Sequence, residues 1–166
     1  MAVVADDETM DKVKKIVFEM AKLSRVKAVF QKLSVRDSEG RSILFHVIGF
    51  SNISPKVRVG ENIVDYLAIL DEIDGEQHEV LSKVLKEGGV VLFPKKIVDV
   101  SYFIDKMPSI INLDEDKDKI DAVARMISDI SRLLAIKRDS MLKILKSIMG
   151  DKNTELLEAY RVVSRR

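Results

Sequence analysis

The chain has 166 residues, of which 46% are apolar, 33% are charged and none is cysteine. Its 28 basic and 27 acidic side chains nearly cancel, which excludes a disordered polyelectrolyte and a strongly basic histone-like protein. Without cysteine, these residues form no disulfide, cysteine-ligated zinc site, iron–sulfur cluster or thiol nucleophile. Residues 1–10 lack a signal-peptide pattern, and the longest apolar run, residues 43–50, is too short to span a bilayer. We therefore expect a cytoplasmic protein of one domain, or of one domain with a small appendage.

The first third of the chain predicts one long helix followed by a β-hairpin. In residues 7–33, apolar side chains recur at steps of three and four, as in an amphipathic helix. Residues 33–36 and 41–50 are β-prone, and the four-residue turn between them ends at Gly40. This spacing is typical of a hairpin. Residues 56–59 are a candidate for a third short strand.

The middle of the chain predicts two helices and one strand. Apolar residues follow helical spacing over residues 63–73, and a second helix continues to residue 85 before Gly88 and Gly89 stop it. Residues 90–94 form an apolar run that ends in proline, which is typical of a short strand.

The second half of the chain is mainly helical in its pattern. Residues 96–107 fit a strand and a helix equally well, and we favour the helix; residues 108–113 read as a loop. From residue 114 onward, apolar stripes at helical spacing predict three helices, the second of which ends at Gly150.

Together these elements predict the α+β class with mostly α content, as a helical bundle with a small antiparallel β insertion. The segments 1–33, 60–88 and 114–166 would form the bundle. The segment 34–59, with or without 89–113, would form the small β element.

No motif for catalysis, metal binding or cofactor binding is recognisable. His46 and His78 have no second histidine three or four residues away, HExxH is absent, and both read as partly buried packing residues. The acidic run 114–118 resembles the start of a calcium loop, but Lys119 stands where that loop needs glycine and Arg125 where it needs glutamate. Glycine-rich phosphate loops and serine nucleophile elbows are also missing. We therefore expect no enzyme activity, no metal and no cofactor.

The basic residues are unevenly distributed along the chain. Residues 12–36 contain eight bases and one acid, Glu19, and residues 132–146 contain five bases and one acid, Asp139. Such a concentration of positive charge attracts a phosphate backbone or an acidic protein. The alternative is a solvent-exposed helix face that has no binding role. A helical wheel places the bases of the first stretch opposite the apolar stripe. The candidate nucleic-acid-binding residues are Lys14, Lys15, Lys22, Arg25, Lys32, Lys137, Arg138, Lys143 and Lys146.

The order of these elements resembles a known family. A long basic first helix, a β insertion over 35–59, the segments 61–75 and 88–94 and a helical second half are similar to the small subunit of archaeal type I-A CRISPR interference complexes. The composition, rich in Lys, Glu, Ile and Val, is also common in heat-adapted proteins. The resemblance implies a non-catalytic subunit of a ribonucleoprotein complex. Its basic residues would contact the backbone of guide RNA or target DNA, and its other faces would contact neighbouring subunits.

Two further hypotheses remain open from the sequence. The first is a protein–protein scaffold or adaptor in another assembly, for example a replication complex, without direct nucleic-acid contact. The second is a small enzyme that uses Asp, Glu and one of the two histidines. The oligomeric state, the identity of the partners and a preference for RNA or DNA do not follow from the sequence, although self-association is compatible with it.

Overall fold

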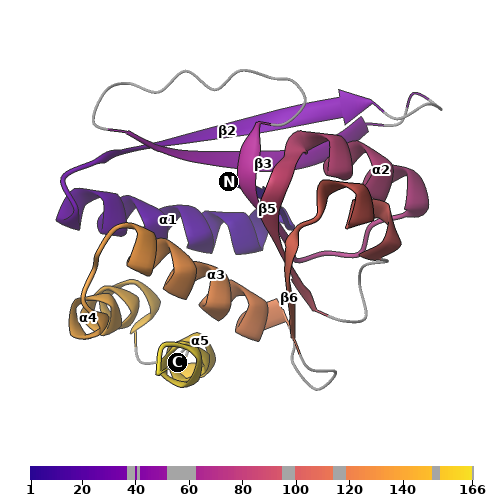
Figure 1. Ribbon diagram of the computed structural model, residues 1–166. Coiled ribbons are helices and arrows are strands. Elements are labelled where there is room, and N and C mark those ends of the chain that lie inside the picture. The colour runs from indigo at the N-terminus through magenta and orange to yellow at the C-terminus, as the bar shows by residue number, and fades with distance from the viewer. Residues whose placement is uncertain are drawn as a thin grey trace.

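The structure is a computed structural model that describes residues 1–36, 40, 42–51, 63–94, 100–113, 119–150 and 154–165. Helices flank a central sheet (Figure 1). The elements in chain order are β1 (Ala2–Val4), α1 (Asp7–Leu23), β2 (Lys27–Arg36), β3 (Ser42–Ser51), β4 (Val64–Ile69), α2 (Gly75–Val84), β5 (Leu85–Pro94), the 3₁₀ helix η1 (Val100–Lys106), β6 (Ser109–Leu113), α3 (Lys119–Leu133), α4 (Arg138–Met149) and α5 (Thr154–Val163).

Within the described residues, six strands form one mixed sheet in the order β2-β3-β1-β4-β5-β6. The four strands β1, β4, β5 and β6 run parallel to their neighbours in this group. β3 is antiparallel to β1, and β2 forms a hairpin with β3 whose register runs from Lys27 opposite Ser51 to Arg36 opposite Ser42. The short strand β1 therefore lies at the junction between the parallel and the antiparallel parts.

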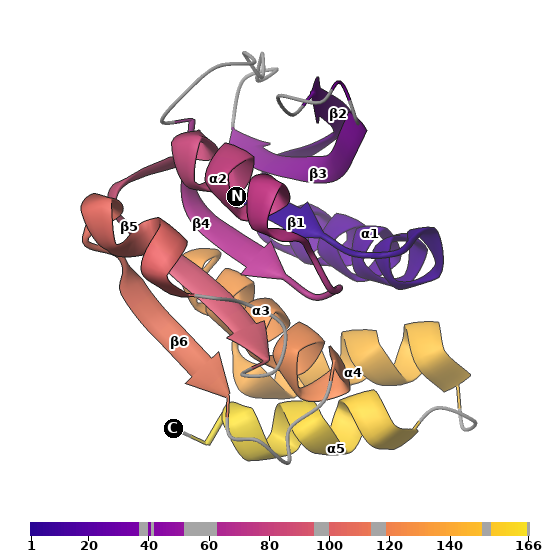
Figure 2. The same cartoon turned by 90° about the vertical axis from the view of Figure 1, so that its right-hand side faces the viewer.

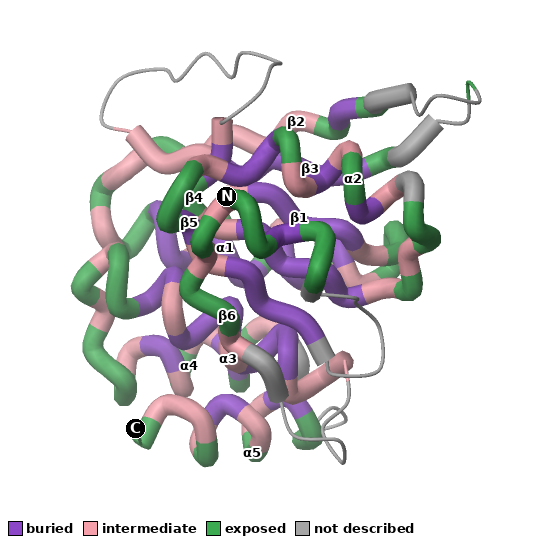
Figure 3. Tube along the Cα trace, turned by 45° about the vertical axis from the view of Figure 1, so that its right-hand side comes forward, coloured by how far each residue is buried: buried purple, intermediate pink, exposed green. Residues whose placement is uncertain are grey.

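Both faces of this sheet are covered. The helices α1, α3, α4 and α5 lie on one face, and α2 and η1 lie on the other (Figures 1 and 2). Along β4 the fully buried residues Leu67 and Ile69 belong to the core beneath α2, whereas Ala68 belongs to the core beneath α1 and α3. Consecutive buried residues consequently occupy 2–4 in β1, 67–69 in β4 and 91–93 in β5 (Figure 3), as expected for parallel strands enclosed by helices.

Local signals explain where the helices begin and end. The Asp6 side chain caps α1 by accepting a hydrogen bond from the backbone N–H of Thr9, and Asp74 and Gln77 form a capping box at the start of α2. These bonds satisfy amide groups that the first helical turn leaves free. α1 ends where Arg25 adopts a left-handed conformation with φ 56°. The N–H groups of Arg25 and Val26 then donate to the carbonyls of Lys22 and Ala21, which closes the helix in a Schellman motif.

The predicted helical bundle with a small antiparallel β insertion is wrong, because the sheet forms the middle layer of an α/β fold. The helix predicted over 7–33 ends at Leu23, and its last part belongs to β2. The helix predicted over 63–73 is the strand β4. Because β4 is buried on both faces, its apolar residues do not alternate with polar ones and imitate a helical stripe.

Other predictions are confirmed in part. The hairpin, the helix that ends near residue 85, the strand at 90–94 and the C-terminal helices are present, and Gly150 with φ 62° ends α4. In the ambiguous segment 96–107, the described part is the helix η1. The predicted loop at 108–113 instead contains β6. The candidate strand at 56–59 and the acidic run 114–118 lie outside the described residues.

In the part of the chain that the structure describes, no helix combines the length and the apolar character needed to cross a membrane.

Candidate functional site

An apolar hollow lies between the sheet and the C-terminal half of α3. It has a volume of about 400 Å³, within the range of small-molecule pockets. Strands β3, β4, β5 and β6 contribute its floor, and α3 contributes one wall. Its lining residues are Met1, Phe50, Asp65, Tyr66, Val90, Ile111, Asp129, Ile130 and Leu133.

One side of this pocket is formed by a network of polar side chains. The Tyr66 hydroxyl donates a hydrogen bond of 2.9 Å to Asp129 Oδ2, and Arg125 Nε donates one of 3.2 Å to the same oxygen. Arg132 lies 3.8 Å from the other carboxylate oxygen. Burial raises the pKa of Tyr66, and the negative charge of Asp129 raises it further, so the hydroxyl remains a hydrogen-bond donor.

The chemistry of this network favours binding over reaction. A general acid or base works best when its pKa lies near the operating pH, whereas the pKa of Tyr66 is displaced away from neutrality. The carboxylate of Asp129 is already engaged by Tyr66 and two arginines. The pocket can therefore hold an apolar group against a fixed polar wall, and sequence patterns gave no signal for it beyond the i,i+4 spacing of Arg125 and Asp129.

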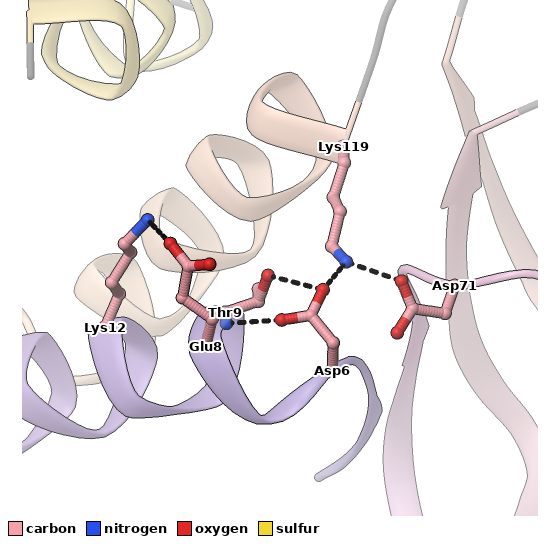
Figure 4. A network of polar contacts seen from close by, with 6 residues as sticks. All are labelled: Asp6, Glu8, Thr9, Lys12, Asp71 and Lys119. Carbon is pink, nitrogen blue, oxygen red and sulfur yellow. Dashed lines mark hydrogen bonds and ion pairs between the residues drawn. The ribbon is translucent and has the colours of Figure 1, made fainter.

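A second polar cluster lies at the carboxyl edge of the parallel strands. β1 is followed by α1 on one face of the sheet, and the adjacent strand β4 is followed by α2 on the other face (Figure 2). This divergence is a topological switch point, where open α/β sheets usually bind ligands. Here Lys119, the first residue of α3, donates hydrogen bonds to Asp6 after β1 and to Asp71 after β4 (Figure 4).

Among the described residues, no phosphate cradle is present at the switch point. Phosphates bind to free amides at a helix N-terminus, but the Asp6 carboxylate already accepts the N–H of Thr9 at 2.7 Å. Ala5 and Asp6, which connect β1 to α1, include no glycine. The hydrogen bond from Lys119 and the one from Thr9 lower the pKa of Asp6 to about 2. The cluster therefore joins three chain segments through one ammonium group shared between two carboxylates.

We expect this cluster to contribute stability that depends on pH. The pKa of Asp6 in the folded state is lowered to about 2, compared with about 4 in an unfolded chain. Its contribution is thus complete above about pH 4 and is lost as the pH falls towards 2. Because the three side chains are partly exposed, the effect should not exceed about 1 kcal/mol. Urea denaturation of the wild type and Lys119→Met between pH 2 and 6 measures it; equal pH slopes for the two proteins would contradict it.

The two histidines, which the sequence predicts to be partly buried, lie in the interior of the protein. His46 and His78 are both buried, and burial together with the charges of Lys14 and Lys32 lowers the pKa of His46. The His78 ring stacks on Tyr102 with a centroid distance of 5.0 Å. Among the described residues, no group of three or more metal-ligating side chains is present.

The structure divides the nine predicted basic residues into two groups and one isolated residue. Lys14 and Lys32 lie near Asp7, to which Lys32 is ion-paired at 3.1 Å, and Lys15 is exposed on α1. The single helical face predicted for the first stretch is wrong, since Lys32 lies on β2 and Arg25 follows the end of α1. The other group surrounds the C-terminus of α1 and the helix α4: Lys22, Arg25, Lys137, Arg138, Lys143 and Lys146.

Comparison with known proteins identifies the fold. No family model and no curated protein matches the chain, but solved structures do. The gamma subunit of a keto/oxoacid ferredoxin oxidoreductase from Geobacter sulfurreducens matches with a TM-score of 0.62 and 16% identity, over 99% of this chain and 94% of that subunit. Subunit PORC of pyruvate oxidoreductase from Thermotoga maritima matches with a TM-score of 0.51 and 15% identity, over 100% of this chain and 93% of that one.

A third match is to part of a longer polypeptide. The 2-oxoglutarate:ferredoxin oxidoreductase from Magnetococcus marinus, solved with 2-oxoglutarate, coenzyme A and succinyl-CoA, matches with a TM-score of 0.55 and 14% identity. The match covers 99% of this chain but 30% of that one. At such identities these likenesses establish the fold.

These findings overturn the family predicted from the sequence. The chain has the fold of ferredoxin oxidoreductase subunits and not that of a helical CRISPR small subunit. The roles in CRISPR defence, guide-RNA binding and target-DNA binding therefore lose their basis, and the adaptor of a replication complex gains no support. The resemblance failed because it depended on the order and composition of elements, several of which are strands and not helices.

Proposed function

We propose that this chain is a subunit of a multi-subunit oxidoreductase of the 2-oxoacid:ferredoxin type. The observation that carries this proposal is the correspondence in extent: the fold match covers 99% of this chain and 94% of the Geobacter gamma subunit. A shared core alone would leave large parts of both chains unmatched. Here the two chains correspond from end to end.

Exposed apolar side chains support a role inside an assembly. The segment from η1 to the edge strand β6 carries four of them: Ile104 and Met107 are 63% and 70% exposed, and Tyr102 and Ile110 are 42% and 45% exposed. Large apolar side chains exposed together on one short segment are typical of a contact with another protein. In the Magnetococcus enzyme the same fold makes up 30% of a longer chain, which fits a module that works in contact with other modules.

Within such an assembly we assign this chain a binding and positioning role and no catalytic role of its own. Its 166 residues contain no cysteine, so they cannot supply the thiolate ligands of an iron–sulfur cluster. The pocket between the sheet and α3 holds a tyrosine that stays protonated and a carboxylate already engaged by two arginines. Electron transfer to ferredoxin would therefore be carried by other subunits.

Purification of the chain from its native cells under mild conditions tests this proposal. We expect a tagged chain to co-purify in fixed stoichiometry with further subunits, as measured by native mass spectrometry. The purified assembly should reduce ferredoxin in the presence of coenzyme A and either pyruvate or 2-oxoglutarate. Omission of the 2-oxoacid and omission of coenzyme A are the controls. A chain that elutes alone, or an assembly without 2-oxoacid-dependent reduction, would overturn the proposal.

A further inference from the structure

The C-terminal end of α1 and the helix α4 with its N-cap carry six basic residues, which we together call the basic face: Lys22, Arg25, Lys137, Arg138, Lys143 and Lys146. Ser24 Oγ donates a hydrogen bond of 3.1 Å to the carbonyl of Leu134, which holds together the turns that carry Arg25 and Lys137. α1 and α4 also pack against each other along the same side of the molecule (Figure 1). The turns of Arg25 and Lys137, and the side chains of Lys22 and Lys143 in one groove, are thus brought together from positions more than 100 apart in sequence.

The basic face is hollowed on both sides of Lys22. Between α1 and α4 lies a groove of about 440 Å³, to which Lys22, Lys143 and Ser140 contribute polar walls and Leu23 and Ile144 contribute apolar ones. A second hollow of about 300 Å³, between α1 and β2, includes Phe18, Ala21, Lys22, Val26, Lys27, Ala28 and Val29. The ammonium group of Lys22 lies 4.5 Å from the centre of the Phe18 ring. Charge and concave apolar surface therefore coincide.

The positive charges of this face are only partly used within the chain. Arg138 donates to Ser164 Oγ and to the carbonyl of Arg161, so it fastens α4 to α5, and Lys22 pairs with Glu19 at 2.6 Å. The other four, among the residues that the structure describes, have no acidic partner within ion-pair distance: Arg25, Lys137, Lys143 and Lys146.

Two of these residues occupy positions that disfavour them. Lys137 is the N-cap of α4 and forms no side-chain cap hydrogen bond. Its positive charge lies at the positive end of the helix dipole, where it is unfavourable. Arg25 adopts a left-handed conformation with φ 56°, which glycine would adopt at a lower free-energy cost. Residues in locally unfavourable positions, with no compensating contact inside the chain, are expected at functional sites.

We propose that the basic face is a docking site for an acidic surface of another protein. Exposed Phe18 and Leu23, each about half exposed at 51% and 53%, favour a protein partner, because protein interfaces combine charge with buried apolar and aromatic side chains. Opposite charge on the partner would steer its association and fix its register. The inference stands on this face alone and does not depend on the oxidoreductase assignment.

Site-specific photo-cross-linking tests this inference in the full chain and in its native cells. We place p-benzoylphenylalanine at Ser140, inside the groove, and at Lys83 on α2 as a control on the other face of the sheet. The cross-linked segment is identified by mass spectrometry. We expect Ser140 to cross-link an acidic protein segment, and Lys83 not to cross-link that segment.

Charge reversal then tests whether charge governs the contact. Lys22→Glu combined with Lys143→Glu should lower the yield of the cross-link about tenfold, whereas Lys83→Glu combined with Lys86→Glu should leave it unchanged. Lysines introduced into the acidic segment of the partner should restore the contact with the variant that combines Lys22→Glu and Lys143→Glu. Circular dichroism verifies that each variant is folded, which is expected because none of the four lysines is buried.

Several results would overturn the inference. They are a cross-link to a neutral or basic segment, to nucleic acid or to a second copy of this chain, no cross-link at all, and a yield that charge reversal leaves unchanged. An assembly that forms and reduces ferredoxin while Ser140 gives no cross-link would remove the docking site and leave the proposed function in place. A cross-link from Ser140 to an acidic protein segment, without an assembly that reduces ferredoxin, would remove the proposed function and leave the docking site.

Discussion

The substitution Ala68→Asp is expected to destabilise the fold by roughly 4 kcal/mol or more, because it places an unpaired carboxylate in the core. Ala68 is fully buried, with an exposed fraction of 0%, and it lies in the core beneath α1 and α3. Its backbone pairs with Val3 on one side and Leu92 on the other. A charge there is removed from water and placed among apolar side chains.

The same substitution separates the observed strand from the helix that the sequence pattern predicts for residues 63–73. On a helical wheel, position 68 lies about 130° from the centre of the apolar stripe, where an aspartate would be harmless. In the strand β4 the same position faces the core. The milder Ala68→Ser should lower the free energy of unfolding by about 1–3 kcal/mol, since a buried hydroxyl is left to find a partner.

Urea denaturation followed by circular dichroism measures both variants of Ala68. Asp65→Asn is the matched control on the same strand, because Asp65 is exposed and its 2.7 Å ion pair with Lys86 lies at the surface. Its effect should stay within about 1 kcal/mol. A stability of Ala68→Asp close to that of the wild type would mean that β4 is not the central strand of the sheet.

The sequence was sufficient for elements whose two sides differ in environment. The helices α3, α4 and α5 each bury one side and expose the other, so apolar residues at helical spacing revealed them. The hairpin of β2 and β3 was visible from its turn and its β-prone flanks, although β2 begins earlier than predicted. The strand β1 gave no signal because it has only three residues, too few for a period to appear.

The architecture could not be derived because it depends on pairings between distant segments. Val3 pairs with both His46 and Ala68, and nothing local to these residues specifies that contact. The same holds for the site, since Tyr66 and Asp129 are 63 positions apart in sequence. The candidate basic residues could be listed from their distribution along the sequence. Their separation into one group near Asp7 and another along α4 follows from the fold.

The substitution Asp129→Ala is expected to lower the free energy of unfolding by about 2–4 kcal/mol, because it leaves a partly buried arginine and a tyrosine hydroxyl without their acceptor. The side chains of Arg125 and Asp129 are 24% and 17% exposed, so water replaces the lost bonds only in part. Tyr66→Phe removes a single neutral donor and should cost about 1 kcal/mol. Urea denaturation of both single variants and the double variant gives the coupling energy of the pair, and strictly additive effects would show that the hydroxyl and the carboxylate do not stabilise each other.

The raised pKa of Tyr66 adds a test with a definite sign. The folded state keeps a phenolic proton that an unfolded chain releases near pH 10. Stability from this group is therefore complete below about pH 10 and falls as the pH rises further, because deprotonation then favours the unfolded state. The wild type should lose stability between pH 9.5 and 11 more steeply than Tyr66→Phe, and the difference between the two curves isolates this residue from the other tyrosines and the lysines. Parallel curves would mean that Tyr66 is accessible to water and that the wall of the pocket is open.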